Sequence, residues 1–214
     1  MRVNEQGRSM IEMLGVLAIV GVLSVGGIAG YSKAMNKFKA NKFIDQVNTI
    51  STNVRTMYAT QRGYKNLNNT TAASLGILPT ETYSANETIT STGEVSHVFG
   101  GSLVVHSAAT AGSENGAFII ATDGIPVGAC MAVLTTDWGG DAGSGLIGLQ
   151  VTTGTAVAGY QAISASNTLA SAVSAEAGAV TAIPGGDVSI PMELTDATLV
   201  CGKTGTTSIA WKFL

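Results

Sequence analysis

The sequence predicts an α+β protein in which a long N-terminal helix packs on a C-terminal globular head with an antiparallel sheet. Two observations lead to this fold class. Residues 9–61 have the pattern of one uninterrupted helix, apolar in its first half and amphipathic in its second. Beyond residue 100, short segments rich in Val, Ile and Thr are bounded by Gly, Asp or Asn, which is typical of strands joined by turns. The 214 residues suffice for one domain and an anchor.

The apolar half of the predicted helix is long enough to cross a membrane. Residues 13–32 hold 20 positions without a charge, directly after Glu12. A helix of that length measures about 30 Å, the thickness of a bilayer's hydrocarbon core. A cleaved secretory signal is disfavoured, because its apolar core has only about 7 to 15 residues and ends in a small-x-small site. A carboxylate at the edge of such a span is costly and usually functional, although Ser9 and Glu12 also fit an S-x-x-E capping box.

The second half of the predicted helix carries a single apolar stripe. No proline occurs between residues 1 and 78, and Gly63 is a plausible C-terminal cap. Apolar residues recur mostly at spacings of three and four at Ile44, Val47, Ile50, Val54, Met57 and Tyr58. This pattern predicts a rod whose second half lies against the head.

Glycines interrupt the apolar half of the rod at a cost of up to about 1 kcal/mol each in helix propensity. Gly26 and Gly30 form a G-x-x-x-G pair, which permits close approach of a second helix. Local unwinding of the stem at these glycines is the alternative use.

The predicted head combines short strands and short helices. Gly128–Thr136 is predicted as a helix, and residues 64–100 as a connecting loop with one short helix near 71–75. Residues 152–186 have a small-residue composition that fits either a surface insertion or a helix around 169–177. The expected strands are 102–106, 117–122, 146–152, 188–190 and 207–213.

Charge is divided unevenly along the chain. Residues 1–65 carry a net charge of +6 and residues 66–214 a net charge of −9. The basic stem and acidic head would attract when copies stagger along a fibre, or the stem lysines would lie near anionic lipid headgroups. An acidic head disfavours direct nucleic-acid binding.

Catalytic and metal-binding patterns are not found in the sequence. His97 and His106 are isolated and lie in no metal-ligand spacing. Nucleophile-elbow, phosphate-loop and EF-hand motifs are missing as well. We therefore expect no enzyme activity, no metal site and no cofactor.

The N-terminus resembles the class III signal of type IV prepilins. In that family a short hydrophilic leader ends in Gly, and the fifth residue of the mature chain is Glu within an apolar helix. Gly7, Arg8 and Glu12 match this register. The resemblance implies a leader of residues 1–7, a stem of residues 8–62 and a globular head of residues 63–214. Gly21 also matches a glycine common in the family's stem.

The resemblance further implies a set of partners and a location. A prepilin peptidase would cut the Gly7–Arg8 bond and methylate the new amine, and the inner-membrane pilus assembly machinery would polymerise the chain into a helical homopolymer. Glu12 would pair with the amine of a neighbouring subunit. The head would lie in the periplasm before assembly and in an extracellular pilus afterwards. Two features depart from the family: Arg8 stands where an apolar residue is usual, and the leader is short.

Membrane orientation is a point on which two rules disagree. Arg2 and Arg8 precede the span, whereas four lysines follow it between residues 33 and 42, so the positive-inside rule places the C-terminal side in the cytoplasm. The prepilin resemblance and the two cysteines favour an exported head, and we give them precedence.

The two cysteines are Cys130 and Cys201, which lie 71 positions apart. In an exported head a disulfide is favoured over two unrelated buried thiols. A disulfide that closes a C-terminal segment is also implied by a looser resemblance to type IVb pilins, most of all to their conjugation-associated branch.

Three functions follow from these observations. The first is a structural subunit of a type IV pilus of the type IVb kind, which supports adhesion or conjugative contact. The second is a pseudopilin of a type II secretion system, which uses the same signal and stem. The third is a membrane-anchored binding domain unrelated to filaments, for which Gly7 and Glu12 would be coincidental.

Overall fold

The computed structural model describes residues 6–84, 89, 95–110, 112–138, 145–153 and 191–214. The chain divides into two compact units, Met1–Phe38 and Lys39–Leu214. The strand expected at 188–190 and the helix considered at 169–177 lie outside the described residues.

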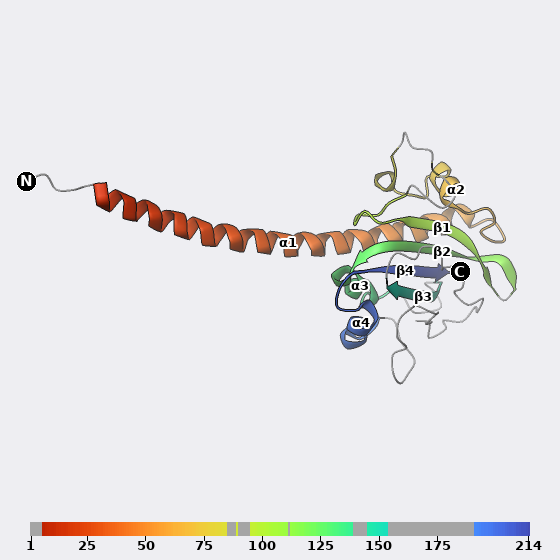
Figure 1. Ribbon diagram of the computed structural model, residues 1–214. Coiled ribbons are helices and arrows are strands. Elements are labelled where there is room, and N and C mark those ends of the chain that lie inside the picture. Colours follow the sequence, from red (N-terminus) through yellow and green to blue (C-terminus); the bar gives the residue numbers. More distant parts are fainter. Residues whose placement is uncertain (1–5, 85–88, 90–94, 111, 139–144, 154–190) are drawn as a thin grey trace, which may run out of the picture. The chain divides into compact units, whose positions relative to one another are not determined.

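The first element is α1, a 53-residue helix over Gln6–Tyr58 (Figure 1). It begins at Gln6, three residues before the expected start at Ser9. Ser9 therefore lies inside the helix and is not its N-cap residue, so the capping-box interpretation is wrong. It also ends before the expected Gln61. A turn follows it, in which the Gln61 amide donates to the Tyr58 carbonyl at 2.9 Å.

Gly63 has another role than the C-terminal cap that the sequence suggested. The backbone of Gly63 lies close to strand β2 (Ser113–Pro126), so that an added Cβ would approach the Asn115 carbonyl oxygen to 2.5 Å. The neighbouring Tyr64 amide donates to that carbonyl at 2.8 Å. A side chain at residue 63 would therefore push the end of the stem off the sheet.

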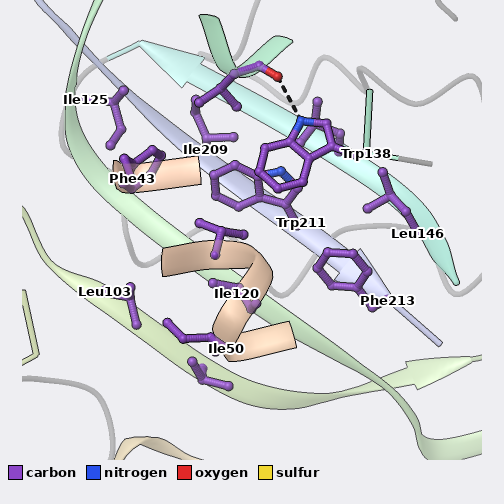
Figure 2. Close-up of a cluster of buried hydrophobic side chains, with 14 of the residues drawn as sticks. Phe43, Ile50, Leu103, Ile120, Ile125, Trp138, Leu146, Ile209, Trp211 and Phe213 are labelled. Carbon is purple, nitrogen blue, oxygen red and sulfur yellow. Dashed lines mark hydrogen bonds between the residues drawn. The ribbon is translucent and has the colours of Figure 1, made fainter. Parts of the chain in front are cut away.

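Within the second unit, the C-terminal half of α1 buries one stripe of side chains. The expected positions Val47, Ile50 and Val54 are fully buried, whereas Met57 is 48 % exposed and lies outside the stripe. Phe43 and Ile50 pack among residues of the sheet (Figure 2). The stripe is completed by Ala40 and Tyr58.

The sheet has four antiparallel strands in the order β1-β2-β4-β3. The strands are β1 (Leu103–Thr110), β2 (Ser113–Pro126), β3 (Leu146–Thr153) and β4 (Thr206–Phe213). The last strand of the chain is therefore central, between β2 and β3 (Figure 1). The expected α+β class with an antiparallel sheet is confirmed.

The register of the central strands aligns large side chains on the face that α1 covers. Trp211 of β4 is opposite Ile120 of β2 and Leu149 of β3, and Phe213 is opposite Phe118. Trp138 packs 5.3 Å from the Trp211 ring and donates from Nε1 to the Val133 carbonyl at 2.8 Å (Figure 2). These aromatic pairs make the sheet and α1 one core.

Two of the four strands, β1 and β2, extend by more than one residue beyond the segments expected from sequence. β2 continues past Thr122 through an irregularity in its pairing with β4 between Thr122 and Ile125. Gly124 lies in this irregularity with φ +67°, a backbone conformation that glycine adopts without strain. The sequence interpretation ended the strand at this turn-like Asp-Gly step.

Short helices flank the sheet. The expected short helices are present as α2 (Asn69–Ser74), with the Asn68 side chain accepting from the Thr71 amide, and α3 (Val127–Leu134). The 3₁₀ turn η1 (Thr80–Thr82) and the helix α4 (Leu194–Cys201) were not expected from the sequence.

Candidate membrane and assembly site

The N-terminal half of α1 is apolar around its whole circumference and meets solvent on every side in the single chain. Its large apolar side chains from Met10 to Tyr31 are between 52 % and 75 % exposed. The helix is long and apolar enough to cross a membrane, and none of its most apolar 18-residue window is buried. An apolar surface of this size requires lipid or other protein to cover it.

The residues of the expected processing and pairing site lie on the first turns of α1. Gly7 and Arg8 have helical backbone, and Glu12 is an exposed residue one turn further along the helix. Glu12 is the acidic residue that begins the apolar span. The proposed cut after Gly7 would place the new amine four residues before this carboxylate.

The stem glycines Gly21, Gly26 and Gly30 are helical, so the unwinding alternative is not adopted in this structure. An added Cβ at any of the three would have no atom within 4 Å. Packing within the chain therefore does not require glycine at these positions. Their proposed use in close helix packing needs a second molecule.

Cys130 and Cys201 form the expected disulfide, with their Cα atoms 5.9 Å apart. Cys130 lies on α3 and Cys201 is the last residue of α4. Both are buried in the core. The bond therefore ties the segment before β4 to the helix after β2.

A polar contact joins α1 to the loops of the head. Lys42 Nζ and Glu81 Oε2 are 3.0 Å apart, and Gln46 Nε2 donates to Glu81 Oε1 at 2.8 Å. These two contacts, with Lys42 first, hold the pKa of Glu81 below its usual value. Gln46 Oε1 also accepts from the Val98 amide at 3.3 Å. The pair is solvent-exposed, so it orients the loop more than it stabilises the fold.

His97 is buried at the point where α1, the loop before β1 and the irregular part of β2 meet. Its Nδ1 accepts from the Phe99 amide at 3.2 Å, so the ring proton is on Nε2, which lies 2.6 Å from the Asp123 carbonyl oxygen. The ring packs edge-on against Phe43 with centroids 5.0 Å apart. Burial lowers the pKa of His97, and the contacts with Asp123 oppose this only in part. The imidazole is thus held neutral as a structural group.

The described residues hold no group of three or more acidic, His or Cys side chains arranged to bind a metal ion. The His97 environment confirms that this histidine is built into the core. The role of His97 could not be predicted from the sequence, because the Phe43 ring and the Asp123 carbonyl that contact it belong to segments far along the chain.

An exposed apolar helix that continues into an amphipathic half packed on an antiparallel sheet agrees with the fold that the prepilin resemblance implied. A family model described as Bundlin, a type IV pilin family, matches residues 32–187. The chain belongs to this family. The match covers the second half of α1 and most of the head, and it leaves out residues 1–31.

One solved structure that the chain matches is TcpA, a type IV pilin from Vibrio cholerae El Tor biotype. The two are 18 % identical, with 82 % of this chain and 99 % of TcpA aligned and a TM-score of 0.46. No curated protein matches the chain.

Proposed function

We propose that the chain is a structural subunit of a type IV pilus of the type IVb kind. It polymerises through the N-terminal half of α1 and presents the disulfide-closed head to other surfaces for adhesion or conjugative contact. The observation that carries the proposal is the apolar stem, exposed on all sides from Met10 to Tyr31. Family membership adds that type IV pilins polymerise into filaments.

The stem requires two successive environments in this proposal. Before assembly it lies in the inner membrane, because its apolar length matches a bilayer. The Cys130–Cys201 disulfide supports a head in the periplasm. In the filament the same surface is buried among neighbouring stems, and the described glycines allow those helices to approach. One surface thus serves both states without a change of fold.

Processing creates the charge pair that aligns neighbouring subunits. A prepilin peptidase cuts the Gly7–Arg8 bond and methylates the Arg8 amine, and the carboxylate of Glu12 pairs with the amine of an adjacent copy. Opposite charges attract strongly in the low dielectric of packed apolar helices, whereas a buried charge without a partner is heavily penalised. The pair therefore favours one axial register.

The test is N-terminal mass spectrometry of filaments sheared from cells that express the chain. We expect a mature chain that begins at N-methylated Arg8. A chain that keeps Met1, or that is recovered only as a membrane-bound monomer, would refute the proposal and favour an anchored binding domain. A processed chain confined to short periplasmic assemblies would favour the pseudopilin alternative.

A further inference from the structure

A cavity of about 280 Å³ lies at the C-terminal end of α1, within the second unit. Its wall is formed by the last turn of α1, the turn that follows, Gly116 of β2 and the residue after β4, Leu214. The side chains with chemical function in this wall are Arg55, Tyr58, Gln61, Arg62 and Tyr64. The lining thus includes two cationic side chains and no acidic side chain.

Arg55 brings a positive charge to the wall of this cavity. Its guanidinium lies 5.1 Å from the centre of the Phe213 ring. Its Nε and Nη2 are buried and have no hydrogen-bond acceptor. Burial lowers the pKa of Arg55, but a guanidinium stays protonated at any physiological pH.

Geometry explains why these two nitrogens stay unsatisfied. An added Cβ on Gly145 would lie 2.6 Å from Arg55 Nη2, so this nitrogen points at the backbone of the loop before β3. Water therefore does not reach Nε and Nη2, and the cation–π contact with Phe213 offsets the lost hydration only in part. The charge of the Arg55 guanidinium thus lies at the wall of the cavity.

The remaining side chains supply hydrogen-bond donors. Arg62 is exposed and can turn its planar guanidinium into the cavity. The rings of Tyr58 and Tyr64 are 5.6 Å apart, and burial raises the pKa of both phenols, so both keep their protons at neutral pH. Gln61 adds an amide.

We propose that this cavity binds a small organic acid of about the size of a monosaccharide, with its carboxylate at Arg62 beside the charge of Arg55. Guanidinium groups match the planar, two-oxygen geometry of a carboxylate. The two phenols and the amide of Gln61 suit the hydroxyl groups of a sugar acid. The volume of about 280 Å³ lies near the lower limit of ligand pockets, about 300 Å³, and suits a ligand of this size. The inference does not depend on filament assembly.

The test is isothermal titration calorimetry on the full chain in a nonionic detergent, with D-glucuronate as the probe. Two other ligands serve as comparisons. D-glucose has a similar shape but no charge, and inorganic phosphate is an anion of smaller size. We expect saturable binding of glucuronate, with glucose and phosphate each at least about ten-fold weaker. Arg62→Gln should weaken glucuronate binding about ten-fold or more, since a charge-assisted hydrogen bond is lost.

Lys65→Gln is the matched control, because Lys65 is an exposed cation near Arg62 that does not line the cavity. It should bind glucuronate like the unchanged protein. Arg62 is exposed, so its substitution should leave the melting temperature unchanged, which separates lost binding from lost folding. No saturable glucuronate binding, equal binding of glucose or phosphate, or an unchanged affinity in Arg62→Gln would each overturn the proposal.

Discussion

At the scale of single residues, His97 couples the stability of the head to pH. Its pKa is lowered in the folded state, chiefly by burial, so the unfolded chain binds the proton more readily. The contribution of neutral His97 is complete above the unfolded pKa of about 6.5, and it is lost as the pH falls toward the folded pKa. The loss has a maximum slope of about 1.4 kcal/mol per pH unit.

We therefore predict that the free energy of unfolding falls between pH 7.5 and pH 5.5. Urea denaturation of the full chain in nonionic detergent measures it. In His97→Gln the protein should be less stable at pH 7.5, and this part of the pH dependence should disappear. His106→Gln is the control, since His106 is only half-buried, and it should keep the pH dependence. If the free energy of unfolding of His97→Gln depended on pH as in the unchanged protein, the pH dependence would belong to other groups.

Glu12 allows the second prediction at this scale. Glu12→Ala removes the carboxylate that we propose aligns neighbouring stems, and it leaves the apolar span intact. We expect an unchanged amount of the chain in the membrane fraction and a loss of at least about ten-fold in sheared filaments, since a pair in a low dielectric is strongly coupled. Immunoblots of both fractions measure this.

Glu114→Ala is the matched control for Glu12, because it removes an exposed acidic residue from the head. It should assemble like the unchanged chain. Filaments of normal yield from Glu12→Ala would remove the proposed role of this residue in assembly.

At the scale of elements, the buried stripe of α1 holds the stem to the sheet. Ile50 is fully buried in the core, whereas Met57 on the same helix is 48 % exposed. Ile50→Ala should lower the free energy of unfolding by about 2–5 kcal/mol, through lost burial and a cavity. Met57→Ala should change it by less than about 0.5 kcal/mol. Chemical denaturation of both variants tests this, and equal effects would contradict the described helix face.

The disulfide is the second element-scale feature that can be measured. It closes a loop of 71 positions between α3 and α4, for which the chain-entropy treatment gives about 4 kcal/mol. The Cys130→Ser/Cys201→Ser double variant should be less stable by about 2–4 kcal/mol in denaturant. Added reductant should destabilise the unchanged chain and not this variant. A stability that reductant leaves unaltered in both would show that the bond does not stabilise the fold.

The elements that the sequence predicted are those whose pattern is local. The stripe of α1 recurs every three or four residues over several turns, and four of the five expected strands coincide with β1, β2, β3 and β4. α4 was missed because Leu194 and Leu199 are 64 % and 63 % exposed, which breaks the apolar periodicity of a short helix. The position of β4 between β2 and β3 depends on long-range pairing, which local periodicity does not encode.

The residues of the candidate sites likewise divide into those that a local sequence pattern predicts and those that only the folded chain brings together. Gly7, Arg8 and Glu12 were found from sequence because they lie within six positions of each other beside an apolar run. The cavity at Arg55 was not predicted from the sequence, because its wall joins residues 55–64 to Gly116 and Leu214. No residue spacing in the sequence predicts that these segments meet. The contacts of His97 were not predicted for the same reason.

At the scale of the whole molecule, the uneven distribution of charge allows two roles for the stem lysines. Residues 1–65 carry +6 and residues 66–214 carry −9. In a staggered filament the basic stem of one copy would lie along the acidic head of another, and the attraction would weaken with salt. Anionic lipid headgroups offer the same lysines another partner, worth about 1 kcal/mol per residue near a membrane surface.

The Lys33→Gln/Lys37→Gln variant decides between these partners, because both lysines directly follow the apolar span and both are exposed. We expect the membrane fraction to keep its amount of the chain, since the apolar span supplies most of the membrane affinity. The yield of sheared filaments should fall several-fold, and filaments of the unchanged chain should be less stable at high salt. Lys65→Gln/Lys203→Gln removes two exposed cations elsewhere and should assemble normally. Loss from the membrane with normal assembly of the remainder would instead assign Lys33 and Lys37 to lipid.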